Sequence, residues 1–216
     1  ITEKAVNKDY EFVGVKTVKV HSVPTVGMKD YTRSGSNRYG TPQELEDQVQ
    51  ELTMGKDRSF TFTVDKGNSE EDQALNAGKA LKRQLEQVIV PEVDKYRLAR
   101  MAAGAKHTKT GSVSKTNAYE TLLDLNGKMD DDGVPSAGRI AFVSTSFYKY
   151  LKLDDSFIKA GDIAQTMRIN GQLGEVDGVA IVKGMGRLPA NVDVLLVHPV
   201  ATTAPHKLAE YKTHID

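Results

Sequence analysis

With 216 residues, the chain is long enough to bury a real core in one elaborated domain or two small ones. Its 29 Lys and Arg residues balance 29 Asp and Glu residues, so no net charge draws it onto nucleic acid or an anionic membrane. Because the chain has no Cys, disulfides and thiolate metal sites are excluded. The apolar run at 192–197 is far shorter than the roughly 20 residues of a spanning helix. The first residues lack a signal-peptide pattern, and we expect Ile1 to be an internal start.

Two stretches near the N-terminus have the composition of strands. Phe12–Val23 is rich in Val and Thr and ends at a proline, and Ser59–Val64 alternates strictly between apolar and polar residues. We expect these two strands to pair as a hairpin. The connection between them, about residues 25–58, is polar and much longer than a hairpin loop of about 2 to 5 residues. A segment without its own core becomes ordered mainly against another subunit.

Residues 41–52 within this connection fit two interpretations. A short helix is favoured by Thr41 as the N-cap, Pro42 at the first helical position and Glu44 as the capping-box acid. Apolar residues then follow at helical spacing, at Leu45, Val49 and Leu52. Alternatively, residues 49–64 form one long strand that is interrupted at Gly55. We favour the strand from about Val49.

A long helix is the clearest element of the sequence. A capping box at Ser69 and Asp72 precedes an apolar stripe at 3.6-residue spacing, whose expected core members are Leu81, Leu85, Val88 and Ile89. Pro91 lacks an amide donor, so we expect the helix to kink or restart near Val90 and then to continue over Glu92–Ala103. The small, polar and basic residues of 106–116 predict a loop.

The remaining sequence alternates between helical and strand patterns. It predicts a helix from the Asn117 cap through Leu125, a turn at Asp130–Gly133, a buried strand at Arg139–Ser144, a helix at Phe147–Leu153, a hairpin around Asp177-Gly178 and a strand at Val192–Val197.

No motif for catalysis or for metal or cofactor binding is present. The five His residues lack ligand spacing, the Asp130–Asp132 run lacks the later oxygen ligands of a calcium loop, and no Ser lies in a nucleophile elbow. The glycine-containing stretch at 104–116 lacks the lysine of a phosphate loop. The basic residues Lys106, His107, Lys109 and Lys115 could contact phosphates, but a solvated loop is favoured. We therefore predict neither a catalytic residue nor a cofactor nor a metal site.

Two phrases carry a family resemblance: NRYGTPQELEDQVQELTMGKDRSFTFTVDKGN and VIVPEVDKYRLARMA. Together with the long polar connection, they resemble major capsid proteins of tailed phages of Gram-positive bacteria, over almost the whole chain. That family has the Hong Kong ninety-seven fold, an α+β fold. The resemblance implies an N-terminal arm remnant (1–12), an extended β-hairpin loop (13–67), a peripheral-domain spine helix with its linker (68–118) and a mixed-sheet axial domain (119–216). Because family members continue beyond KLAEYKTHID with strands of the peripheral domain, it also implies a chain that is trimmed at both ends.

The function that the resemblance implies is that of a coat protein, which self-assembles into the icosahedral shell around phage DNA and is not an enzyme. Its implied partners are copies of itself in hexamers and pentamers, scaffold and portal proteins, and weakly contacted DNA, with no membrane and no small-molecule substrate. The implied location is the virion capsid, assembled in the host cytoplasm. The expected inter-subunit contacts are the charged residues of the extended loop, namely Lys29, Asp30, Arg33, Arg38, Glu44, Glu46 and Asp47. The alternatives are an encapsulin-like compartment and, as a weaker one, a small α/β enzyme.

Overall fold

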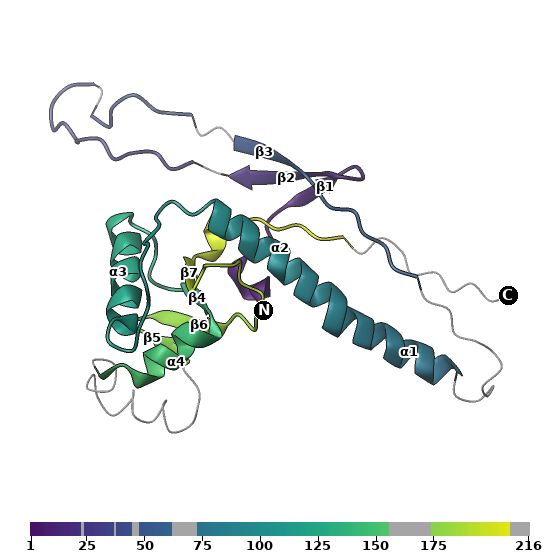
Figure 1. Cartoon of the computed structure of the whole chain (residues 1–216). Helices are drawn as coiled ribbons and strands as arrows, with labels where there is room; N and C mark the ends of the chain where they lie inside the picture. Colours follow the sequence, from purple (N-terminus) through teal and green to yellow (C-terminus); the bar gives the residue numbers. More distant parts are fainter. Residues whose placement is uncertain (23, 37, 45–47, 62–72, 156–173, 208–216) are drawn as a thin grey trace. The chain divides into compact units, whose positions relative to one another are not determined.

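The computed structural model of the chain describes residues 1–22, 24–36, 38–44, 48–61, 73–155 and 174–207 (Figure 1). The chain divides into two compact units, of which the first contains residues 1–6 and 61–202 and the second contains residues 7–60 and 203–216. Each unit has its own sheet.

The first unit contains most of the helices. In chain order its elements are a 3-10 turn at Thr2–Ala5, α1 (Gln73–Gln84), a π-helical turn (Leu85–Ile89), α2 (Val90–Ala103), α3 (Ala118–Asp131), β4 (Ile140–Val143), α4 (Thr145–Leu153), β5 (Glu175–Val176), β6 (Val179–Lys183), β7 (Val194–Val197) and a 3-10 turn at Pro199–Ala201. The second unit contains β1 (Glu11–Val13), β2 (Thr17–Ser22) and β3 (Gln48–Thr53).

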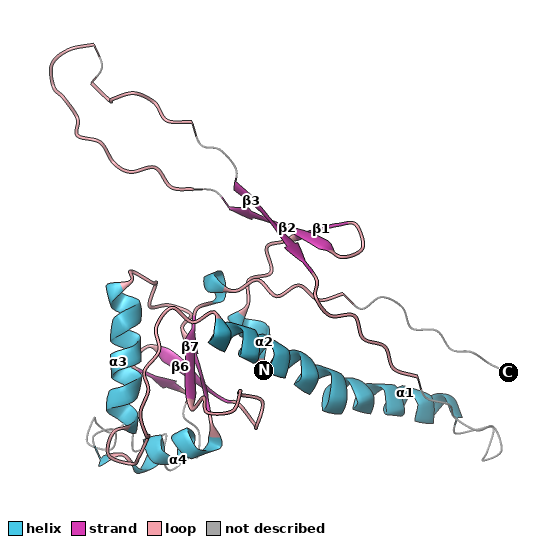
Figure 2. Cartoon of the chain, turned by 45° about the horizontal axis from the view of Figure 1, so that its top comes forward, coloured by secondary structure: helices cyan, strands magenta, loops and turns pink. Residues whose placement is uncertain are grey.

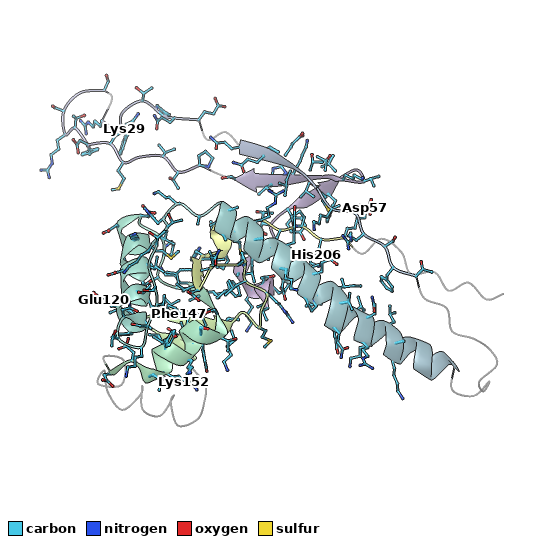
Figure 3. The ribbon with its side chains drawn as sticks, in the orientation of Figure 1. Lys29, Asp57, Glu120, Phe147, Lys152 and His206 are labelled. Atoms are coloured by element: carbon cyan, nitrogen blue, oxygen red, sulfur yellow. The ribbon has the colours of Figure 1, made fainter. Side chains whose placement is uncertain are left out.

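The core of the first unit lies between a mixed sheet and two helices. The strand order is β5-β6-β4-β7, with β6 parallel and β7 antiparallel to the central β4. One face of β4 and β6 packs with α3 and α4, and Phe147 of α4 is completely buried there (Figure 3). Because Ile140 and Phe142 on the opposite face of β4 are buried as well, this strand is apolar throughout, as the sequence predicted.

Most of the elements predicted for this unit are confirmed. β4, α4, β7 and the β5–β6 hairpin lie where the patterns placed them, and Asp177 and Gly178 have the positive φ angles (52° and 73°) that a type I′ turn requires. The helix after Asn117 is longer than predicted, because α3 continues to Asp131. The prediction of a turn starting at Asp130 is therefore wrong, since the chain turns only at Asp132 and Gly133, where Gly133 has a φ of 68°.

α1, the π-helical turn and α2 follow one another without a break (Figure 1). The Val90 amide donates to the Leu85 carbonyl, which is the i→i−5 bond of a π turn. Pro91 follows directly, and its ring would clash with the carbonyl of Gln87 in a regular helix. The helix is therefore irregular near Val90, where a kink or restart was predicted, but it continues through the π turn and does not restart there. The capping box at Ser69 and Asp72 lies outside the described residues.

The expected buried core at the start of this helix is only partly found. Leu81, Leu85 and Ile89 are half-buried, whereas Val88 is 47% exposed, so the prediction is wrong for Val88. The physical reason is the π turn, whose extra residue rotates the apolar stripe relative to 3.6-residue spacing. The buried side chains of the helix follow in α2, at Asp94, Arg97, Leu98 and Met101.

The second unit has a three-stranded antiparallel sheet in the order β1-β2-β3 (Figure 2). The predicted strand Phe12–Val23 is divided into β1 and β2 by a turn at Gly14, which has a φ of 85°. The favoured strand from about Val49 is confirmed only over its first part, as β3, so residues 48–53 are not helical. Its predicted continuation beyond Gly55 is wrong as far as residue 61, and residues 62–64 lie outside the described residues.

The predicted pairing partner of β2 is wrong. β2 pairs with β3 and not with Ser59–Val64, of which residues 59–61 form no strand and the others lie outside the described residues. Cross-strand chemistry explains the choice: β3 places Leu52 opposite the completely buried Val18, and Glu51 forms an ion pair with Lys19 at 3.6 Å.

Candidate inter-subunit surface

The segment between β2 and β3 projects from the sheet as a long loop that has no core of its own (Figure 2). Its described residues, within 24–44, form neither helix nor strand, and all except Pro24 and Gly40 are exposed. Ordering so many residues costs conformational entropy that almost no burial offsets within the chain. The loop is therefore the part of the described chain that gains most from contact with a partner.

Local contacts nevertheless define the shape of the loop tip, where Lys29 lies (Figure 3). The Thr32 amide donates to the Arg38 carbonyl at 3.2 Å, and the Tyr31 and Tyr39 rings lie 5.3 Å apart. The Lys29 ammonium donates to the Thr41 carbonyl at 2.9 Å. These contacts fold the tip back on itself, so a partner would meet a partly preorganised surface.

The expected contact residues are exposed wherever the structure describes them. Lys29, Asp30, Arg33, Arg38 and Glu44 lie exposed on this loop, and Glu46 and Asp47 lie outside the described residues. Two of the cations also hold the loop together, because Arg38 Nε donates to the Gly35 carbonyl at 3.3 Å in addition to the Lys29 bond. The role of all these charges in subunit contacts stays a prediction.

The sequence reasoning missed an apolar group at the same tip. Met28 is 99% exposed, Tyr39 84%, Tyr31 52% and Val26 46%. Aromatic residues and Met are enriched at protein–protein interfaces, whereas isolated charges at a rim contribute little affinity. The available signal was the presence of these large side chains in a polar segment that offers them no core.

In the first unit, a buried carboxylate on α2 holds the N-terminal segment. Asp94 accepts hydrogen bonds from the Thr2 amide and hydroxyl at 3.0 and 2.7 Å and from the Ile1 nitrogen at 2.8 Å, and it also pairs with Arg187. Burial alone would raise the pKa of Asp94, but the hydrogen bonds from Ile1 and Thr2 outweigh it and lower the pKa. Neighbouring Arg97 donates to Glu3 at 3.0 Å. This cluster positions residues 1–6 on the helix.

The basic cluster of the 106–116 loop faces acidic residues of α3 and its C-terminal end. Lys106 and His107 contact the Asp132 carboxylate at 2.7 and 2.8 Å, and Lys109 pairs with Asp124. The hydrogen bonds from Lys106 and His107 lower the pKa of Asp132. Because these side chains are engaged within the chain, the arrangement favours a structural role for them over phosphate binding. Lys115, the fourth member, is exposed.

Arg139 is one of the residues that line an open pocket of about 530 Å³, together with small residues, Ile140, Pro199 and the charged residues Lys4 and Glu175. Its guanidinium is engaged elsewhere: it donates to the Asn126 side-chain oxygen at 2.6 Å and to the Pro135 carbonyl at 3.0 Å, and it pairs with Asp130 at 2.7 Å. It therefore acts as a structural tie between α3 and β4 and does not offer charge to a ligand.

Among the described residues, no group of three or more His, Asp or Glu side chains could hold a metal ion. Within the same part of the chain, no helix is both long and apolar enough to cross a membrane.

The chain is similar to known proteins in its structure. No family model and no curated protein sequence matches the chain. A solved structure of Mycobacterium phage Che8 superposes with a TM-score of 0.56 at 18% identity, over 86% of this chain and 68% of that chain. The capsid structure of the cyanophage P-SCSP1u superposes with a TM-score of 0.53 at 15% identity, over 82% of this chain and 61% of that chain.

These superpositions establish the fold class. The chain has the α+β fold of phage capsid structures, which confirms the fold that the sequence resemblance implied. It spans 68% and 61% of the length of the two matched chains. Identities of 18% and 15% establish the fold alone, since one fold hosts many functions.

Proposed function

We propose that the chain is the coat subunit of a tailed phage, which assembles with copies of itself into the shell that encloses the phage DNA. The observation that carries the proposal is the combination of the capsid fold with a loop of which almost every described residue is exposed. A closed symmetric shell supplies such a loop with the same partner surface in every copy, so that weak contacts act together.

The parts of the chain have separate roles in this proposal. Residues 13–67 form the extended loop with its base strands, 68–118 the peripheral-domain helix with its linker, 119–216 the axial domain, and 1–12 the arm, whose first three residues contact Asp94 and Arg97. Hexamers and pentamers, contacts to scaffold and portal proteins, and weak contact with DNA belong to the same proposal, as does assembly in the host cytoplasm. The role is structural and requires neither a cofactor nor a substrate.

The test is assembly. The protein, expressed in the form that its gene encodes, should yield regular hollow particles or stable rings by light scattering and negative-stain microscopy. A strict monomer both alone and with the phage's own scaffold and portal proteins would refute the proposal. Particles that contain protein cargo and never DNA would instead indicate an encapsulin-like compartment.

A deletion separates assembly from folding. Removal of Lys29–Arg38, bridged by two glycines, should leave the thermal unfolding of the subunit unchanged, because the described residues of this segment are all exposed. The same deletion should abolish particles. Particles that still form would show that the loop tip is dispensable for the shell.

A further inference from the structure

Among the described residues, β3 is an edge strand of its sheet. It pairs with β2 on one side only, and all its residues are exposed. An open edge presents a row of unpaired backbone donors and acceptors, and a further strand can add to it.

The register identifies which backbone groups are free. The Met54 amide donates to the Lys16 carbonyl at 2.8 Å, so these residues form a hydrogen-bonded pair of the antiparallel ladder. Since such pairs alternate, Leu52, Gln50 and Gln48 also direct their backbone groups toward β2. Val49, Glu51 and Thr53 direct theirs outward, and no other described residue bonds to them.

We propose that β3 pairs antiparallel with β3 of a second copy about a two-fold axis at Gln50, which joins two three-stranded sheets into one. The inference rests on the proposed function only in that the partner is another copy of this chain. Hydrogen bonds would join Val49 to Glu51 of the second copy and the reverse, and the two Gln50 side chains would lie opposite each other. A two-fold contact is the commonest symmetric way in which copies associate.

Charge selects this register over its neighbours. A shift to an axis at Glu51 would place two Glu51 carboxylates directly opposite each other, and an axis at Val49 would place Glu51 opposite Asp47. A shift by half a step would match outward groups of one copy with inward groups of the other. In the proposed register, Glu51 keeps its own Lys19 on one side and meets Val49 of the second copy on the other.

The absence of Cys from the chain provides a direct test by crosslinking. Opposed residues of a non-hydrogen-bonded pair have Cα atoms about 4.5 Å apart, within the range that a disulfide spans. Gln50→Cys should therefore form a covalent dimer in most of the protein under mild oxidation. Glu51→Cys and Val15→Cys, the latter in the exposed β1–β2 turn, should crosslink at least tenfold less. Efficient crosslinking through Glu51→Cys instead would overturn the proposed axis.

A backbone variant tests the hydrogen bonds themselves. Val49→Pro removes an outward amide and none of the β2–β3 bonds, so in the Gln50→Cys background it should abolish the crosslink and leave thermal unfolding unchanged. Val49→Ala keeps the amide and should keep the crosslink. A crosslink that survives Val49→Pro would show that the two copies meet without strand pairing.

Particle formation and the Gln50→Cys crosslink together test the strand pairing and the coat function independently. Particles that form without any Gln50→Cys crosslink would leave the coat function standing and refute the pairing. A crosslink in protein that forms no particles, even with the phage's scaffold, would support the pairing and refute the coat function.

Discussion

At Arg139, acceptors from α3 and from the loop before β4 converge on a guanidinium whose side chain is 2% exposed. Arg139→Met would leave the Asn126 and Pro135 oxygens without their donor. Removing one partner of a buried charged network costs about 3 to 5 kcal/mol, and we expect that loss in urea unfolding. Lys149→Met, at an exposed position of α4, should change stability by less than about 0.5 kcal/mol. Equal effects of the two substitutions would contradict the structural role of Arg139.

Asp94 makes stability depend on pH. Its pKa is below the usual 3.8 in the folded chain, so its contribution is complete above that value and is lost as the pH falls through the folded pKa. Asp94→Asn should cost about 3 kcal/mol at pH 7. The difference between wild type and variant in urea unfolding should shrink as the pH falls below 3.8. A difference that stays constant from pH 7 to pH 2 would show that the charge of Asp94 is not responsible.

At the scale of the element, the long helix is anchored by its second half. Leu98 in α2 is completely buried, whereas Val88 in the π turn is 47% exposed. Leu98→Ala should therefore cost about 2 to 5 kcal/mol by leaving a cavity, and Val88→Ala less than about 1 kcal/mol. Calorimetry of the unassembled subunit measures both. A larger loss for Val88→Ala would restore the original assignment of the core to this turn.

We expect Pro91 to be the cause of the π turn. Pro91→Ala restores an amide donor and removes the ring that a regular helix cannot accommodate. We expect the helix to regularise and stability to rise by about 1 to 3 kcal/mol, with altered amide exchange at 85–90. Pro189→Ala, in the loop before β7, should leave that exchange pattern unchanged. If the π turn persists in the Pro91→Ala variant, its cause lies in the packing of α2.

At the scale of the whole molecule, the sequence patterns correctly predicted those turns, strands and helix ends that depend on neighbouring residues. The Asp177-Gly178 turn, the buried strand β4 and the end of the helix at Gly104 all follow from neighbouring residues. The partner of β2 did not follow, because a nonlocal pairing depends on which residues meet across the sheet, and Leu52 opposite Val18 was not readable from either strand alone. The exposure of Val88 depends on a helical irregularity that a fixed period cannot represent.

The same limit applies to the candidate surface. The charged residues of the loop were identified from composition, whereas the large side chains of Met28 and Tyr39 in the same polar segment were overlooked, and the structure shows them 99% and 84% exposed. If the loop binds another subunit, burial of these two side chains should contribute more to the binding free energy than the charges at the rim do. Exposed ion pairs contribute only about 0 to 1 kcal/mol.

A comparison of two variants decides between the two kinds of contact. Met28→Ser combined with Tyr39→Ser should reduce particle yield at least tenfold and leave subunit unfolding unchanged, because neither residue is buried in the chain. Arg33→Ser combined with Asp30→Ser removes one charge of each sign and should reduce yield less than threefold, with the loss confined to low salt. Sedimentation of assembled particles across salt concentrations measures both. A stronger loss from the charge variant would return the contact to the residues that the sequence first indicated, because the entropy of ordering the loop would then be offset by ion pairs instead of apolar burial.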